Sequence, residues 1–192
     1  MKLNVREVIK PAVALIVICL VSSLLLAGTN AITKDKILET QKKQAEQSRQ
    51  LVFPEAASFG PEQTVPVDGG DNDVTYCTAL DATGANIGYV FTNTCRGYGG
   101  DVTVMTGIDP NGTVARTVIL SMDDETPGLG QNAGKPDFLD QFTGKTSPFQ
   151  WVKADGQGSD ITGVTSASFT SKAVIACVNQ ALTVYQSLGG EQ

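Results

Sequence analysis

An uncharged and mostly apolar segment spans residues 11–33, between Lys10 and Lys34. Folded as one α-helix, a segment of this length is long enough to cross the hydrocarbon core of a bilayer. Two further cations, Lys2 and Arg6, lie on its N-terminal side. Because positive charge is retained on the cytoplasmic side of a membrane, we expect a cytoplasmic N-terminus and an extracytoplasmic, or periplasmic, main domain.

A cleaved signal peptide is the competing interpretation of this segment. Its apolar core, residues 12–27, is long for the apolar region of a signal peptide, and no convincing small-x-small cleavage site follows it. Thr29 stands where a lipoprotein would need a cysteine after Leu-Leu-Leu-Ala-Gly. The sequence therefore favours a retained, single-pass anchor in the cell (inner) membrane.

The composition changes twice after the anchor. Residues 35–50 contain neither Gly nor Pro and favour a helix, which would act as a stalk. Pro54 and the Pro-, Gly- and Asp-rich residues 60–73 then indicate a turn-rich boundary. What remains is large enough for one hydrophobic core. The expected divisions are a cytoplasmic N-terminus (1–10), an anchor (11–33), a stalk and linker (34–73) and one domain (74–192).

Within that domain the pattern predicts four strands followed by helices. Asp81-Ala82-Thr83-Gly84 and Asp109-Pro110-Asn111-Gly112 are natural hairpin connections. The strands that they join span 74–80, 86–92, 102–108 and 113–120. A short helix is expected at 138–142 and a long one at about 170–188. The predicted class is therefore α+β, an antiparallel sheet with one long helix packed against it.

The long helix is expected because apolar residues recur at helical spacing. These are Ala173, Val174, Cys177, Val178, Ala181, Leu182, Tyr185 and Leu188. Hydroxyl side chains crowd its start: Thr165, Ser166, Ser168, Thr170 and Ser171. One of them could simply cap the helix. The same helix start also offers free amide N–H groups and a positive dipole end that favour a phosphate, which a hydroxyl could carry covalently.

Residues 165–174, TSASFTSKAV, resemble the flavinylation motif of the FMN-binding domain family. That domain occurs in the G subunit of Rnf electron-transport complexes and in the C subunit of Na+-translocating NADH:quinone reductases. The family pattern reads roughly Asp-x-x-Ser/Thr-Gly-Ala-Thr-x-Ser/Thr-Ser, and the Thr after Ala carries FMN through a phosphodiester. By this resemblance Ser168 replaces the acceptor Thr and Ser166 replaces Gly, while Thr162 stands where the family usually has Asp.

A second register is open. Thr162-Gly163-Val164-Thr165 also reads as Thr-Gly-x-Thr, which would make Thr165 the acceptor, with Ser159 or Asp160 near the acidic position. We favour Ser168, because only that register keeps the following Thr-Ser pair and starts the helix at the right distance. Thr165 stays the alternative.

Further segments of the chain resemble the same family, in the same order. Residues 125–130 read Glu-Thr-Pro-Gly-Leu-Gly, residues 97–100 read Gly-Tyr-Gly-Gly, and residues 141–145 read Gln-Phe-Thr-Gly-Lys. A Pro-Gly stretch alone would indicate an ordinary turn. Together with the helix start, these segments extend the resemblance over roughly residues 76–185.

The resemblance implies covalently bound FMN, which makes the chain a flavoprotein and, in the chemical sense, a phosphoprotein. It implies no catalytic residue and no metal ligand in this chain. The implied FMN-binding residues are Ser168 (alternatively Thr165), Ser166, Ala167, Thr170, Ser171, Tyr98, Glu125, Thr126, Leu129, Gly130 and Lys172. Lys145 is a further candidate for phosphate or ring contacts.

The implied function is electron transport within a membrane translocase. The chain would relay electrons between flavin or iron–sulfur partners in a complex that couples ferredoxin:NAD+ oxidoreduction to ion transport, and would not be a complete enzyme. Its partners would be the other membrane subunits and, during maturation, a flavin transferase. The alternatives are a component of Na+-translocating NADH:quinone reductase or of an extracellular electron-export system, and a non-redox, membrane-anchored binding module.

Composition narrows these classes. The chain has no histidine, which excludes His-based catalysis and haem ligation by its own imidazole. Residues 51–192 carry 6 basic against 16 acidic side chains, which argues against a nucleic-acid partner. No P-loop or dinucleotide-binding Gly pattern is present. The cysteines have no metal-binding spacing, and a Cys77–Cys95 disulfide and separate core cysteines are both open.

Overall fold

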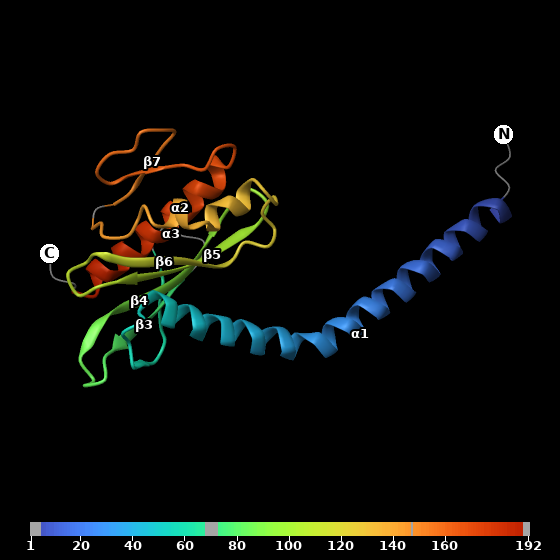
Figure 1. Ribbon diagram of the computed structural model, residues 1–192. Helices are drawn as coiled ribbons and strands as arrows, with labels where there is room; N and C mark the ends of the chain where they lie inside the picture. Colours follow the sequence, from blue (N-terminus) through green and yellow to red (C-terminus); the bar gives the residue numbers. More distant parts are fainter. Residues whose placement is uncertain (1–4, 68–72, 147, 190–192) are drawn as a thin grey trace. The chain divides into compact units, whose positions relative to one another are not determined.

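The computed structural model of the protein describes residues 5–67, 73–146 and 148–189 (Figure 1). Residues 1–4, including the Lys2 used to orient the anchor, and residues 68–72 of the predicted linker lie outside the described residues. The chain divides into two compact units, Met1–Gln44 and Ala45–Gln192.

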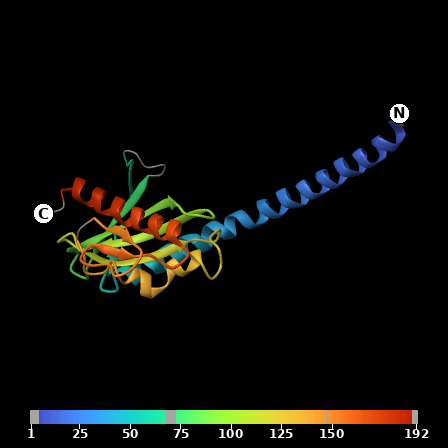
Figure 2. The same ribbon diagram turned by 90° about the horizontal axis from the view of Figure 1, so that it is seen from above.

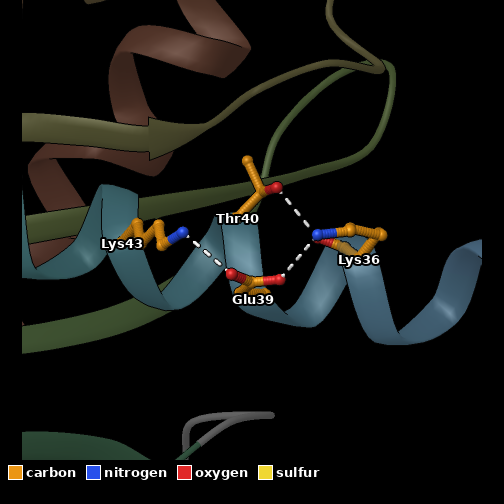
Figure 3. A network of polar contacts seen from close by, with 4 residues as sticks. All are labelled: Lys36, Glu39, Thr40 and Lys43. Atoms are coloured by element: carbon orange, nitrogen blue, oxygen red, sulfur yellow. Dashed lines mark hydrogen bonds and ion pairs between the residues drawn. The ribbon is translucent and has the colours of Figure 1, made fainter.

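The first unit consists of helix α1, which as a whole spans Val5–Val52 and so continues into the second unit. Anchor and stalk thus lie in one uninterrupted helix. From Ile9 onward α1 is long and apolar enough to cross a membrane, with a mean hydropathy of 2.5 in its most apolar window. Beyond that window Glu39 accepts hydrogen bonds from Lys36 (3.1 Å) and Lys43 (2.8 Å) (Figure 3). These exposed pairs contribute little stability but favour helix in the stalk.

The second unit is built on one antiparallel sheet. Its strand order is β1-β3-β4-β5-β6, and β2 also pairs with β3. The strands are β1 (Ser58–Phe59), β2 (Gln63–Val65), β3 (Val74–Leu80), β4 (Asn86–Arg96), β5 (Asp101–Ile108) and β6 (Val114–Ser121). The predicted α+β class is confirmed, and β4 extends four residues past the predicted end at Thr92.

Both faces of the sheet are covered, which explains the long buried runs in its central strands. Helix α3 (Ser168–Ser187) lies along one face, as Figures 1 and 2 show in red, on side chains that include Phe91, Val104 and Ile108. The last turn of α1 contributes Val52 to the core on the other face. Gly107 allows this approach, since a Cβ there would lie 2.2 Å from a methyl carbon of Val52.

Between β6 and α3 the chain forms short elements. These are the 3-10 helix η1 (Gly130–Gly134), helix α2 (Pro136–Leu139), and the parallel pair β7 (Gln150–Val152) and β8 (Asp160–Thr162). The short helix expected at 138–142 begins two residues earlier and ends at Leu139, because Pro136 favours the first turn of a helix. The β7–β8 pair was not predicted.

The buried cysteines lie on opposite faces of the sheet. Cys77 packs with the core beneath the end of α1, whereas Cys95 and Cys177 pack in the core beneath α3. A Cys77–Cys95 disulfide, one of the two arrangements that the sequence left open, is therefore wrong. Instead, Cys95 Sγ lies 2.6 Å from Cys177 Sγ.

Candidate functional site

The segments singled out in the sequence meet at the N-terminus of α3, around a cavity of about 320 Å³. Its wall combines the loop after β4, the loop after β6, the first residue of η1 and the start of α3. Nine residues expected at the site line this cavity, together with Phe169. They are Tyr98, Glu125, Thr126, Leu129, Gly130, Ser166, Ala167, Ser168 and Thr170.

Glu125 joins these segments from a buried position, with 1% of its surface exposed. Its Oε1 accepts hydrogen bonds from the amide N–H groups of Tyr98 (2.7 Å) and Gly99 (3.3 Å). Its Oε2 accepts a hydrogen bond from the Thr170 hydroxyl at 2.8 Å. The carboxylate therefore holds two loops against α3, and both of its oxygens accept hydrogen bonds from the protein.

Glycines make room for this carboxylate. A Cβ on Gly97 would lie 2.1 Å from Glu125 Oε1, and one on Gly130 would lie 2.3 Å from Oε2. Both distances are far inside van der Waals contact, so neither position accepts a side chain without displacing the Glu125 carboxylate or the loops. Gly97 from the Gly-Tyr-Gly-Gly segment and Gly130 from the Pro-Gly-Leu-Gly segment thus make room for the Glu125 carboxylate.

The first turn of α3 has unpaired hydrogen-bonding groups. The helix begins at Ser168, and its N-cap residue, Ala167, provides no side-chain cap. Within the described part of the chain, no partner is present for the Ser168 hydroxyl or for the amide N–H groups of Ser168, Phe169 and Thr170. Such a group of donors at the positive end of a helix dipole suits an anionic ligand.

Ser166, just before this turn, has a left-handed backbone conformation with φ 62°. Glycine adopts this conformation without steric cost, whereas other residues are strained in it. Ser166 is also the residue that takes the place of the motif glycine when Ser168 takes the place of the acceptor. In the Thr165 register the matching glycine is Gly163, which is not among the described residues with positive φ. In the Ser168 register, the position of the motif glycine therefore has a conformation that glycine adopts without strain.

Ser166→Gly is expected to stabilise the protein by up to about 1 kcal/mol, because it removes the left-handed strain. Ser166→Val should destabilise it by a similar or larger amount, since a β-branched residue disfavours positive φ. Thermal unfolding of the full chain in detergent measures both changes. A lower melting temperature for the glycine variant would contradict the assignment of strain to this residue.

Thr165 does not line the cavity at Ser168. It is exposed and lines a second cavity of about 380 Å³, together with residues that include Lys135, Gln141 and Thr162. The two candidate acceptors, only three residues apart, thus face separate cavities. The loops that carry Glu125 and Tyr98 surround the cavity at Ser168.

Three other candidate residues do not line the cavity at Ser168. The buried Ser171 hydroxyl donates to the Ala167 carbonyl (2.9 Å) and accepts from the Val164 N–H (2.9 Å), which fixes the turn before α3. Lys172 Nζ lies 4.8 Å from the ring centroid of Trp151. Lys145 Nζ donates to the Asp160 carbonyl at 3.3 Å. These side chains shape the surroundings of the site.

Phe169 was not among the expected site residues. Its side chain is 70% exposed, and its ring centroid lies 6.2 Å from that of Tyr98, which is 71% exposed. Leu129, 45% exposed, lines the same cavity. A signal was present in the sequence, because Phe169 falls outside the apolar stripe of the helix, where an aromatic residue has no core to enter.

Comparison with protein families identifies an FMN-binding domain and an N-terminal region that match this chain. A family model described as an FMN-binding domain matches residues 97–183, and one described as the RnfG N-terminal region matches residues 1–52. The chain is 34% identical to the G subunit of the Na(+)-translocating ferredoxin:NAD(+) oxidoreductase complex of Acetobacterium woodii, over 95% of the chain and 94% of that relative. It is 28% identical to the G subunit of the ion-translocating oxidoreductase complex of Methanosarcina acetivorans, over 92% of the chain and 94% of the relative.

Solved structures show the same fold. The C subunit of Na(+)-translocating NADH-quinone reductase from Parabacteroides distasonis aligns with a TM-score of 0.56 at 18% identity, over 81% of this chain and 96% of that one. NqrC of Shewanella oneidensis aligns with a TM-score of 0.52 at 18% identity, over 71% and 70% of the two chains.

Proposed function

The chain belongs to the RnfG family, the G subunits of Rnf complexes, and from this we propose that it is the electron-carrying flavoprotein of a membrane-bound, ion-translocating ferredoxin:NAD+ oxidoreductase complex. The observation that carries the proposal is the Ser168 hydroxyl at the uncapped start of α3, which has no hydrogen-bond partner among the described residues. It faces a cavity that is bounded by the segments that resemble the FMN-binding domain.

The residues around Ser168 fit the phosphate end of FMN. An ester bond from Ser168 Oγ to the phosphorus would place the remaining anionic oxygens beside the free amide N–H groups of Phe169 and Thr170. The positive end of the α3 dipole favours the same charge. Ser168 is only half-buried, so a separate flavin transferase could reach its hydroxyl before or after the domain folds.

The cavity mouth fits the aromatic end of the cofactor. Tyr98, Leu129 and Phe169 present apolar surface there that the protein itself leaves uncovered. When bound, FMN supplies the one- and two-electron chemistry of an electron carrier. The role of these three residues is then to hold a flat ring at the surface, within reach of a partner's redox centre.

Glu125 acts as a positioning residue in this proposal. Its carboxylate accepts hydrogen bonds from Tyr98, Gly99 and Thr170, so its role is to hold the cavity walls in place. An unpaired carboxylate facing the phosphate would repel it. The hydrogen bonds from the protein stabilise the carboxylate in the orientation that faces Tyr98, Gly99 and Thr170.

The membrane anchor fits a carrier that belongs to a membrane complex. We propose that α1 crosses the membrane once, with the N-terminus cytoplasmic and the flavin-carrying unit outside the cytoplasm. Its partners are the other Rnf subunits, which supply and accept the electrons, and the flavin transferase that attaches FMN. Family membership favours this role over those of the NADH:quinone reductase, of an electron-export system and of a non-redox binding module.

Co-expression of the full chain with a flavin transferase tests the proposal. Denatured protein should fluoresce on a gel and gain about 438 Da, the mass of FMN less one water. A known flavinylated substrate, produced in the same cells, shows that the transferase is active. If that substrate is modified while this chain stays colourless and of unmodified mass, the proposed function is wrong.

A further inference from the structure

Two cysteines meet between the sheet and α3, away from the cavity at Ser168. Cys95 on β4 and Cys177 on α3 are 82 residues apart in the chain, and their Sγ atoms lie 2.6 Å apart. Cys177 is fully buried, and Cys95 is 8% exposed. Both belong to the core beneath α3.

The surroundings hold these side chains in place. Asn93, two residues before Cys95 on the same face of β4, donates from Nδ2 to the Cys177 carbonyl (3.1 Å) and to Gln180 Oε1 (2.8 Å). Cys95 Sγ donates to the same Gln180 oxygen at 3.5 Å. Two anchored elements therefore present their sulfurs to each other, closer than unbonded sulfur atoms pack and about half an ångström beyond a disulfide bond.

We propose that Cys95 and Cys177 form a cross-linking site, which closes to a disulfide by exchange with a small-molecule or protein disulfide. The Cys95 thiolate attacks one sulfur of the donor, forms a mixed disulfide and releases one donor thiolate. The Cys177 thiolate then attacks the Cys95 sulfur and releases the second. The protein loses two protons and two electrons, and the donor disulfide takes up both electrons as it becomes two thiols.

The order of these two steps follows from the environment of each sulfur. Cys95 keeps 8% of its surface exposed, whereas Cys177 is fully buried. A hydrogen bond from Cys177 lowers the pKa of Cys95, and the same pairing, together with burial, raises the pKa of Cys177. Cys95 is thus the thiol that meets the donor, and Cys177 resolves the mixed disulfide.

The bond would tie α3 to β4 and close a long loop of chain. Closure of a loop this long restricts the unfolded chain strongly, so the oxidised protein should melt on the order of 10 °C above the reduced one. The cross-link lies within the helix whose first turn forms the cavity at Ser168. It would keep that helix seated on the sheet.

Thiol counting on the full-length chain tests the site. Protein in detergent is equilibrated with mixtures of oxidised and reduced glutathione. It is then unfolded and alkylated with N-ethylmaleimide, and the number of labels is measured by mass spectrometry. The chain has four cysteines, so four labels are expected under reducing conditions and two under oxidising conditions. The two retained labels should lie on Cys19 and Cys77.

Cysteine variants are the controls for this count. Cys77→Ala, which removes a buried thiol on the opposite face of the sheet, should still lose two labels on oxidation. Cys95→Ala should keep three labels at every glutathione ratio. Four labels on the native chain at every ratio, or protection that depends on Cys77, would overturn the proposal. Because the count on the native chain needs no substitution, a variant that fails to fold does not obscure the answer.

Discussion

Ser168→Ala is expected to abolish covalent flavin, so that the chain co-expressed with an active flavin transferase neither fluoresces on a denaturing gel nor gains mass. The variant removes the one hydroxyl of the α3 first turn that both lines the cavity and lacks a hydrogen-bond partner in the described structure. For the same reason its stability should change by less than about 0.5 kcal/mol. Loss of flavin would then reflect loss of the acceptor.

Two matched variants make this test specific. Ser168→Thr keeps a hydroxyl at the same place and supplies the residue that the family motif itself uses, so it should retain covalent flavin. Thr165→Ala removes the rival hydroxyl, which faces the second cavity, and should leave flavin unchanged. A fully fluorescent Ser168→Ala chain together with a dark Thr165→Ala chain would move the attachment to Thr165.

The sequence predicted the four longer strands of the sheet because their hairpins are locally encoded, whereas the short strands β1 and β2 lie in the predicted linker and were not predicted. Asp81 illustrates the local encoding: its Oδ1 accepts hydrogen bonds from the N–H groups of Thr83 (2.7 Å) and Ala85 (3.0 Å), and Gly84 adopts φ 83°. Such turn chemistry depends on neighbours in the chain, so it can be read from a few consecutive residues. The position of each hairpin then follows from the turn.

The elements that were missed depend on contacts distant in sequence. β7 and β8 are three residues each and pair in parallel, so neither is long enough to show a period. Their arrangement depends on packing such as that of Trp151 against Gly163, where a Cβ would lie 2.0 Å from the indole nitrogen. Burial of β4 beyond Thr92 likewise depends on α3, which lies far along the chain.

The sequence predicted which segments lie next to one another at the candidate site better than it predicted what each side chain does there. Resemblance placed Tyr98, Leu129 and Ser168 together, and the cavity confirms that they are neighbours. The resemblance could not show that the Ser171 hydroxyl is hydrogen-bonded within the turn before α3, or that Lys172 lies over Trp151. Such roles depend on side-chain direction, which the family pattern does not record.

The left-handed conformation of Ser166 shows how the two sources of information combine. Two registers of the motif fit the residues, and they differ in which hydroxyl is the acceptor. The left-handed conformation of Ser166 is one that glycine adopts without strain, which fits the register that puts Ser166 at the motif glycine. The family motif alone does not choose between Ser168 and Thr165, and the φ angle of Ser166 alone says nothing about an acceptor.

Glu125→Ala is expected to cost about 3 kcal/mol of unfolding free energy and, in a unit of this size, on the order of 10 °C in melting temperature. The change leaves the Tyr98 N–H and the Thr170 hydroxyl without their acceptor at a buried position. Glu125→Gln should cost about 1 kcal/mol or less, because its amide oxygen still accepts from Tyr98 and its NH₂ can donate to a reversed Thr170 hydroxyl. Thermal unfolding of the full chain measures both.

Asp124→Asn provides the matched surface control, since it removes a neighbouring but exposed carboxylate and should change stability by less than about 0.5 kcal/mol. The ranking of the three variants separates two accounts of Glu125. If the carboxylate matters as an acceptor that holds the walls, Ala is severe while Gln and the control are mild. If the carboxylate matters through its charge, Glu125→Gln should lose as much unfolding free energy as Glu125→Ala. That result would contradict the role of Glu125 as the acceptor that links the Gly-Tyr-Gly-Gly loop to α3.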